Sequence, residues 1–388
     1  LYIVSGGNEF EPNTPILKDR LYINNGKGSF NYNNSSLPDN FSSGMRVSSA
    51  DFDKDGDIDL FVGGRVVPGS YPLPAESFLL ENISDANGIK FKNTDESIFS
   101  FKEIGLVTSS VWTDYNNDGW EDLVVVGEWT PIKFYKNMEG KFSEDTSLID
   151  IDSTRGWWYD VISEDFDNDG DMDLVIGNLG NNYKYQASGD ETFDIFYNDF
   201  DKNNSGDIVL SYYSDGEQYP LRGRQCSSDQ IPAIKTKFQD YDAFSIATLE
   251  DVYTEPDLEN SLHYFTKTFS SVYLENTGNS FVMNKLPVLA QLSSINKILS
   301  SDIDKDGYKD IIVSGNMYNS EVETPRNDGS VGVYLKFTPD SGFEAVSTQK
   351  SGLFINGDVK DMEFITLNNT DYIISAKNDD LIEFTKIK

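Results

Sequence analysis

The sequence has one cysteine and one histidine in 388 residues, Cys226 and His263. A single cysteine excludes an internal disulfide. With one imidazole we can assemble no convincing Ser-His-Asp triad, Cys-His pair or zinc constellation. His263 lies among apolar residues at helical spacing, where packing or surface exposure is the commoner role. These shortages disfavour enzymes that depend on thiol, imidazole or zinc chemistry.

Positive charge and long apolar runs are also scarce. The chain carries 31 Lys and Arg against 65 Asp and Glu, a net charge of −34. This charge argues against binding to nucleic acid or to an anionic membrane. No apolar run is long enough to span a membrane, and no signal peptide opens the sequence. A hydrophobic content of 38%, with 25 Phe and 21 Tyr, is nevertheless enough for a packed core.

The chain is rich in aspartates on alternate positions around a glycine. In residues 165–173 (DFDNDGDMD) the predicted ligands are Asp165, Asp167, Asp169, the backbone carbonyl of Asp171, and Asp173. The aspartates offer hard oxygen ligands, and Gly170 takes the sharp turn. The pattern is the first half of an EF-hand loop, but Ile176 stands where an EF-hand needs glutamate. An all-oxygen, carboxylate-rich shell favours calcium over zinc or copper.

This loop recurs along the chain. The other full copies are Asp51, Asp53, Asp55, Asp57 and Asp59; Asp114, Asn116, Asp118, Trp120 and Asp122; and Asp302, Asp304, Asp306, Tyr308 and Asp310. A partial copy consists of Asp199, Asp201, Asn203, Ser205 and Asp207, with Asn204 in place of the glycine. One Asp/Gly cluster could equally be an ordinary turn, but four full copies in the same phase predict cation sites. We therefore predict four calcium ions, and for the partial loop both interpretations stay open.

Each loop is followed by a short apolar run. These runs cover residues 60–64, 123–127, 174–177, 208–212 and 311–315, and two related runs without a loop cover residues 1–7 and 371–376. Continuous apolarity predicts strands buried on both faces. Hairpin patterns alternate with them at residues 21–30, 134–142 and 272–281, and more loosely at 79–91, 195–200, 333–343 and 381–384.

Seven copies at about 55 residues each predict an all-β fold, a seven-bladed β-propeller with calcium loops, as one domain over residues 1–388. Because residues 1–7 already have the pattern of a strand, we expect the first blade to be truncated at its N-terminal side. We also expect the natural N-terminus, with its targeting signal, to be missing. Residues 222–270 interrupt the repeats. Apolar residues at helical spacing in 229–244, and a cap at Thr254 and Asp257 before Leu258, Leu262 and Phe265, predict a helical insertion between two blades.

On these loops and strands the chain resembles the FG-GAP/VCBS family of β-propellers, which includes the integrin α-chain propeller. Further segments resemble the large secreted or lipid-anchored FG-GAP proteins of Bacteroidota that often carry an ASPIC/UnbV segment; they are residues 1–10, 61–74, 126–132, 177–183 and 219–234. The ASPIC/UnbV segment itself is absent from this sequence, so none of its properties is carried over.

The resemblance implies a C-terminal propeller of a longer protein. It also implies a calcium-stabilised module on the outside of a cell, at the outer membrane and lipid-anchored through the missing N-terminal region. Partners implied are a protein, peptide or glycan, in some relatives an outer-membrane uptake complex. Millimolar calcium affinity would agree with an extracellular place.

Propellers bind ligands on loops at one end of the central channel. Candidate ligand-binding residues are Arg65, Tyr71, Trp129, Trp157, Trp158, Asn181, Tyr183, Arg222, Arg224 and Tyr318. Aromatic faces and amides suit a glycan or peptide, and arginines suit a carboxylate. The alternative, which we favour, is that the tryptophans pack between blades and the arginines bridge acidic loops.

We expect a non-catalytic binding or scaffold module. The competing hypothesis is a carbohydrate-active or phosphoester-cleaving propeller that uses calcium or free carboxylates. A carboxylate pair that faces an open central pocket without contacting an ion would favour the enzyme.

Overall fold

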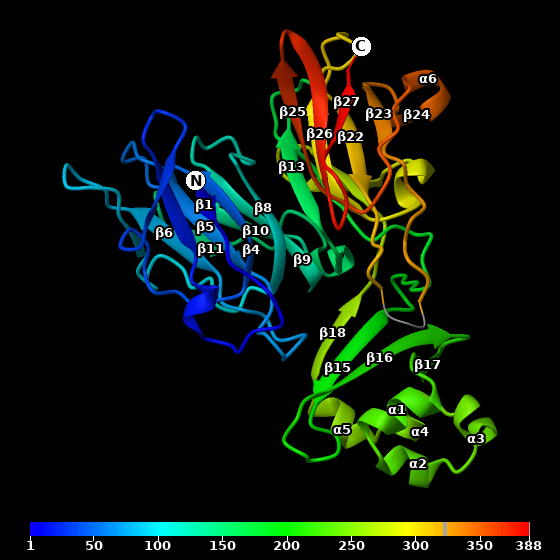
Figure 1. The fold of residues 1–388 in the computed structure, drawn as a ribbon. Helices are drawn as coiled ribbons and strands as arrows, with labels where there is room; N and C mark the ends of the chain where they lie inside the picture. The colour runs from blue at the N-terminus through cyan, green and yellow to red at the C-terminus, as the bar shows by residue number, and fades with distance from the viewer. Residues whose placement is uncertain (321–323, 388) are drawn as a thin grey trace.

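The computed structural model describes residues 1–320 and 324–387, and it consists mainly of antiparallel β-sheets (Figure 1). We number six of the sheets in chain order and name the seventh, which lies within sheet 4 in the sequence, the inserted sheet. The expected all-β class is confirmed.

The first three sheets use the first 157 residues. Sheet 1 contains β1 (Tyr2–Ile3), β2 (Arg20–Asn24) and β3 (Phe30–Asn33). Sheet 2 contains β4 (Gly44–Ala50), β5 (Asp59–Gly64), β6 (Phe78–Asn82) and β7 (Phe91–Asn93). Sheet 3 contains β8 (Leu106–Thr113), β9 (Asp122–Thr130), β10 (Lys133–Asn137), β11 (Phe142–Glu144) and β12 (Gly156–Trp157).

The remaining sheets follow. Sheet 4 contains β13 (Asp160–Glu164), β14 (Asp173–Gly177), β19 (Val272–Asn276) and β20 (Phe281–Lys285). The inserted sheet contains β15 (Phe193–Asn198), β16 (Asp207–Ser214), β17 (Glu217–Pro220) and β18 (Leu262–Thr266). Sheet 5 contains β21 (Ile295–Ser301), β22 (Asp310–Gly315), β23 (Val333–Thr338) and β24 (Gly342–Val346). Sheet 6 contains β25 (Val359–Leu367), β26 (Thr370–Lys377) and β27 (Glu383–Lys386).

The helical elements are short. They are α1 (Arg224–Gln230), α2 (Ala233–Lys237), α3 (Tyr241–Ser245), α4 (Leu249–Val252), α5 (Glu255–Glu259), α6 (Thr348–Ser351) and the 3-10 turns η1 (Pro15–Leu17), η2 (Ile151–Thr154) and η3 (Val288–Gln291). None of the helices in the described residues is long and apolar enough to cross a membrane.

The apolar strands after the full loops are buried along nearly their whole length. This holds for β5, β9, β14 and β22, as their continuous apolarity predicted. The strand over residues 208–212 differs, because the burial of β16 alternates along the strand. The prediction of burial on both faces is therefore wrong for this copy, and likewise for β26 and for residues 1–7, where β1 is only half-buried.

The first strands of sheets 2 to 6 (β4, β8, β13, β21 and β25) contact one another in sequence order. Polar side chains join them: Ser48 Oγ lies 2.8 Å from Ser110 Oγ, and Thr113 Oγ1 lies 2.8 Å from Ser163 Oγ. Apolar clusters fill the space between consecutive sheets, as between sheets 2 and 3 or sheets 4 and 5. The sheets therefore stack side by side with their first strands on a common inner side.

The helical segment lies inside one sheet, not between two. Strands β14 and β19 pair with each other, so residues 178–271 form an excursion from sheet 4 that contains a whole sheet as well as α1 to α5. Figure 1 shows this unit standing apart from the six numbered sheets. The expected place between two blades is wrong because a strand pairing across nearly a hundred residues leaves no local sequence signal.

Within the excursion, the sequence predicted the helices better than their ends. Thr254 caps α5 by accepting from the amide of Asp257, as expected. Leu262 and Phe265, expected to continue that helix, lie on β18 instead. His263 is also on this strand, where its ring stacks on Phe196 at 4.2 Å and not on a helix.

Candidate metal loops and the opposite end of the strands

The full loops share one backbone design. In residues 165–173, the carboxylate of Asp165 accepts the amides of Asp169 and Gly170, each at 3.1 Å. The turn requires positive φ at two positions, +61° at Asn168 and +96° at Gly170. The glycine tolerates this without strain, which explains why position 6 is glycine in every full copy.

The same contacts recur in the other loops. The first aspartate accepts the amide of position 6 in the loops that begin at Asp51, Asp114 and Asp302, at 3.1, 2.7 and 3.2 Å. The amide of position 7 donates to the side chain of position 5 in each loop; the donors are Asp57, Trp120, Asp171, Ser205 and Tyr308. Such repetition means that the spacing of the aspartates, and not their surroundings, determines the loop.

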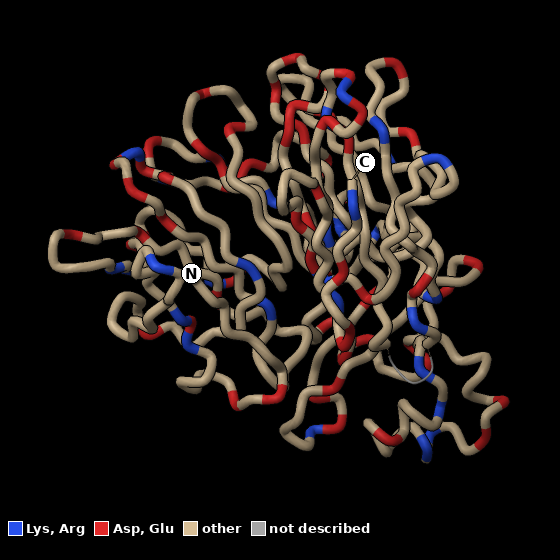
Figure 2. Tube along the Cα trace, turned by 45° about the horizontal axis from the view of Figure 1, so that its top comes forward, with Lys and Arg blue, Asp and Glu red and all other residues tan. Residues whose placement is uncertain are grey.

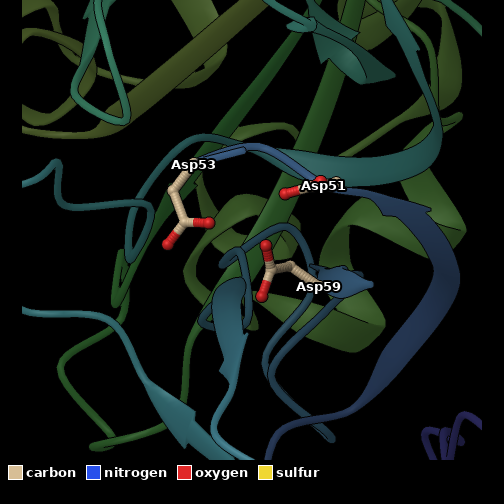
Figure 3. Close-up of side chains that lie close together, drawn as sticks. All are labelled: Asp51, Asp53 and Asp59. Carbon is tan, nitrogen blue, oxygen red and sulfur yellow. The ribbon is translucent and has the colours of Figure 1, made fainter. Parts of the chain in front are cut away.

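Carboxylates converge inside these loops. In four of them, three aspartates bring one oxygen each to within 4.8 Å of one another; the sets are Asp51, Asp53 and Asp59; Asp165, Asp167 and Asp169; Asp199, Asp201 and Asp207; and Asp302, Asp304 and Asp306. Figure 3 shows the first set, whose carboxylates turn toward a common space. Clustered carboxylates repel one another unless a cation lies between them.

Loop 51–59 also contains buried oxygens that lack a donor. Asp51 Oδ1, Asp57 Oδ1 and Asp59 Oδ2 are inaccessible to solvent and have no hydrogen-bond partner. Buried acceptors without a partner are costly, and a bound cation would satisfy them. These residues could therefore hold a metal ion, and their all-oxygen chemistry fits a hard cation.

The loop at residues 114–122 is the exception among the full copies. Asn116 replaces the second aspartate, and its Nδ2 donates to Asp122 Oδ2 at 2.7 Å. The amide therefore neutralises one acceptor that a cation would otherwise take, and the loop has fewer charged oxygens than its relatives.

The last aspartate of each loop has a second role. Asp173 is buried at the start of β14, and it accepts the amides of Phe166 and Asn276 and the hydroxyl of Tyr273. It therefore ties its own loop to the neighbouring strand β19. Burial raises the pKa of Asp173 to about 7, and it has the same effect on Asp59 and Asp122.

The partial loop adopts the same geometry as the full ones. Asp199 accepts the amides of Asn203 and Asn204 at 2.9 and 2.8 Å. Asn204 takes φ of +67°, a conformation that asparagine tolerates better than most residues. The missing glycine therefore does not prevent the loop from forming. This loop lies in the inserted sheet, away from the other four.

Neighbouring full loops contact one another through their fourth residue. The ammonium of Lys54 lies 4.0 Å from the ring centre of Trp120 in the next loop. Asn117 donates to the carboxylate of Asp171, and Asn168 donates to the carbonyl of Gly307 at 3.1 Å. The four loops therefore form a continuous row across sheets 2 to 5. Figure 2 shows Asp and Glu residues on many turns of the chain.

One lysine already contacts a set of candidate ligands. Lys336 on β23 pairs with Asp304, and its ammonium lies 2.8 Å from Asp306. A cation in this loop would have to share these carboxylates with the lysine or displace it, so we expect this loop to bind more weakly than its neighbours.

A comparison with protein families matches these loops. Residues 2–62 and 114–176 match the model of the FG-GAP-like repeat. The chain contains FG-GAP-like repeats. The matched segments include the loops at 51–59, 114–122 and 165–173 with the strands that follow them. No curated protein matches the sequence.

A comparison with solved structures matches this chain to three proteins, all at low identity and low TM-score. The biofilm matrix protein Bap1 of V. cholerae is 11% identical over 87% of this chain and 66% of that chain, with a TM-score of 0.29. BBS1N, solved in complex with ARL6DN, is 9% identical over 89% and 93%, with a TM-score of 0.24. Sqt1 of Chaetomium thermophilum is 10% identical over 88% and 82%, with a TM-score of 0.28. This chain spans about two thirds of the Bap1 chain.

At the opposite ends of the FG-GAP strands, three of the candidate ligand-binding residues come together. Tyr71 donates to Glu128 Oε1 at 2.8 Å, Arg65 pairs with Glu128 Oε2, and the indole of Trp129 donates to Tyr71. Glu128 thus joins the cluster, although the sequence singled out only its neighbours. A signal existed, because an acid inside the buried run of β9 needs a partner.

This cluster is mostly satisfied and buried. Trp129 is 1% exposed, and its ring packs on Trp157 and Phe193. Two donors remain without a partner, Arg65 Nη1 and Trp157 Nε1. The cluster is therefore a buried structural core with two unpartnered donors, and it does not form an open groove.

The other candidates are dispersed. Trp158 is fully buried between sheets 3 and 4. Arg224 donates to the carbonyl of Phe238 in the excursion, and Tyr318 lies under the guanidinium of Arg326 at 4.5 Å. Of the remaining ones, Tyr183 packs edge-on to Tyr185 in the same apolar cluster as Trp129 and Trp157, whereas Asn181 bonds Ser270 and Arg222 precedes α1. The structure does not assemble these ten residues into one site.

Proposed function

We propose that the chain is a non-catalytic, calcium-binding β-propeller module that presents a surface to a protein, peptide or glycan partner at the cell surface. The observation that carries the proposal is the convergence of carboxylates in loops of one repeated design, with buried unpartnered oxygens in loop 51–59. Such loops cost free energy unless a cation offsets the repulsion.

Calcium is the ion that suits these donors best. All donors are oxygens, from carboxylates at positions 1, 3, 5 and 9, with the amide of Asn116 at position 3 of loop 114–122, and from a backbone carbonyl at position 7, which is a hard and flexible set. When bound, the ion would supply the positive charge that holds the carboxylates together. The closing aspartates would then transmit this order to the adjacent strands through the hydrogen bonds that Asp173 exemplifies.

The propeller itself belongs to this proposal. Its support is the side-by-side order of the first strands of sheets 2 to 6 and the apolar packing between consecutive sheets. A count of seven blades would need a ring member besides sheets 1 to 6, since the inserted sheet branches from sheet 4.

The partner surface would lie at the strand ends opposite the calcium loops, near Arg65 and Trp157, each of which has a buried donor without a hydrogen-bond partner. A net charge of −34 on the chain argues against nucleic acid as the partner. Location on the outside of a cell, at an outer membrane and beside an uptake complex, remains part of the proposal, supported by the calcium that is plentiful there.

The enzymatic alternative has no observation in its favour. The groups of three close carboxylates in the described part of the chain all belong to the loops. Asp160, near the inner side, is occupied by hydrogen bonds from Ser109 and from the amide of Ile298. The only imidazole, that of His263, stacks on Phe196 in the inserted sheet.

A thermal melt with and without calcium tests the proposal. The melting temperature should fall when a chelator is added and rise again with saturating calcium, since the ion binds the folded state. Asp169→Asn should reduce the calcium response, and the matched control Asp340→Asn, in a turn outside the loops, should leave it unchanged. A melt that does not move on protein verified to be calcium-free would overturn the proposal.

A further inference from the structure

One lysine of sheet 6 is held with little freedom. Lys377 is the last residue of β26, and its side chain is only 5% exposed. The aliphatic part of this side chain lies on the backbone of Gly357, where an added Cβ would come within 3.0 Å of the lysine Cδ. Gly357 has φ of +101°, so its conformation favours glycine as well. The close contact therefore fixes the place of the ammonium group.

The ammonium of Lys377 contacts two groups of different chemistry. Nζ donates to Oδ1 of Asn356 at 3.3 Å, and it pairs with the carboxylate of Glu383 on β27. Within the described residues, Nδ2 of Asn356 donates to no protein acceptor, so no hydrogen bond to the protein restrains that nitrogen. An amine, an amide carbonyl and a carboxylate therefore meet at one point of the fold.

The backbone around Asn356 is fixed on both sides. The amide of Ile355 donates to the carbonyl of Val331 at 2.7 Å, and the carbonyl of Gly357 accepts from Asn316 Nδ2 at 2.8 Å. Ile355 is fully buried, whereas Asn356 itself is exposed. The loop therefore presents the asparagine to the lysine in a fixed position, and a small product released there can diffuse into water. Holding two reacting groups in this way raises their effective concentration.

We propose that Lys377 and Asn356 become joined by an intramolecular amide bond. Glu383 accepts one proton from the ammonium, and the free amine attacks Cγ of Asn356. The bond from Cγ to Nδ2 then breaks as Nδ2 receives two protons, one from Nζ and the one held by Glu383, so that it leaves as an ammonium ion. Glu383 ends ionised as it began. Atoms and charge balance, and the reaction needs no other reactant.

The bond fixes the loop before β25 to the end of β26. Val359 of β25 and Lys377 already face each other in the sheet, and the amide keeps the two segments together when the sheet opens. The chain has one cysteine, so an internal disulfide cannot serve this purpose. Closing residues 356–377 into a ring also restricts the unfolded chain, as a disulfide does. This cross-link is independent of calcium and of the proposed binding function.

Mass spectrometry of the denatured full chain tests this bond. The protein should be lighter than its sequence by the mass of one ammonia, and proteolysis should release one branched peptide that contains both Asn356 and Lys377. Lys377→Arg keeps a positive charge beside Glu383 but supplies no amine, so this variant should have its full mass. Glu383→Gln removes the proton acceptor and should slow the reaction about a hundredfold or more, so that most of the purified variant keeps its full mass.

A second reaction at Asn356 has to be distinguished from the cross-link. The amide nitrogen of Gly357 can attack the same Cγ and release ammonia, but its product is a ring within one peptide, and Lys377→Arg would retain it. Lys360→Met, at an exposed lysine of β25, is the matched control and should keep the branched peptide.

The branched peptide is sought in the unaltered chain, so the test does not depend on the folding of a variant. A chain of full mass, or one that yields no branched peptide, overturns the proposal. A mass loss that Lys377→Arg retains in full also overturns it.

Discussion

The aspartates of one loop should differ in how they stabilise the fold. Residues 165–173 allow a direct comparison of two of them. Asp173 is buried and holds three donors, the amides of Phe166 and Asn276 and the hydroxyl of Tyr273. Asp169 is exposed and accepts from the loop itself. Both would be calcium ligands, but only Asp173 also joins two strands.

The magnitudes follow from the groups left without partners. Asp173→Ala leaves three buried donors without a partner, each costing about 1–3 kcal/mol, so a loss of roughly 3–9 kcal/mol in unfolding free energy is expected even without calcium. Asp169→Ala removes one exposed hydrogen bond and one repulsive charge, so its cost without calcium should stay under about 1 kcal/mol. With calcium present, Asp169→Ala should lose the additional stabilisation that its site provides.

Urea unfolding near neutral pH, followed by tryptophan fluorescence, measures both variants in chelator and in saturating calcium. The slope of the unfolding free energy on urea should be unchanged, so that midpoints can be compared. Equal losses for the two variants in chelator would refute the reasoning, since the closing aspartate would then have no structural role apart from the ion.

Three other outcomes can be checked with the same protein. In chelator, stability should fall as the pH rises from about 4 to about 7, because burial raises the pKa of Asp59, Asp122 and Asp173 to about 7 and the unfolded chain ionises these carboxyls more readily; urea midpoints that rise over this range would disagree. Lys336→Met should tighten calcium binding by its loop about tenfold in calorimetry, since the ammonium contacts two candidate ligands; unchanged affinity would mean that the lysine does not compete. Trp129→Ala should cost about 3–5 kcal/mol in urea unfolding, because the ring is fully buried; a loss below about 1 kcal/mol would show that the cluster at that end is loose.

Local chemistry made the loops and their strands predictable. Positions 1, 3, 5, 6 and 9 lie within nine residues, and the hydrogen bonds that shape the turn link those same residues, as Asp165 and Gly170 illustrate. The strands that follow had an equally local signal in their continuous apolarity. The hairpins at β2 and β3, β10 and β11, and β19 and β20 were predictable from the turns between their strands.

Long-range pairing was not predictable in this way. Strand β14 pairs with β19, and the segment between them contains a whole sheet and five helices. The residue pattern near Gly177 gives no sign of this pairing. His263 illustrates the consequence, since apolar residues at helical spacing also fit the strand β18, where His263 stacks on Phe196 and its neighbour Tyr264 packs against another apolar cluster. The loop-to-loop contacts of Lys54 and Asn117 were missed for the same reason.

The candidate ligand residues show a further limit. Residue type alone identified Arg65, Tyr71 and Trp129, and the structure brings them together around Glu128. Residue type alone could not distinguish an exposed ligand-binding site from a buried hydrogen-bond network, because both use aromatic rings and arginine.

Calcium in the repeated loops is the proposal on which the other parts of the proposed function depend. Crystals grown at millimolar calcium, with anomalous diffraction data collected to locate the ions, test it most directly. The account predicts an ion in each of the four full loops, at 51–59, 114–122, 165–173 and 302–310, coordinated at about 2.3–2.6 Å by their aspartate oxygens. Loops without anomalous density at that calcium concentration would contradict it.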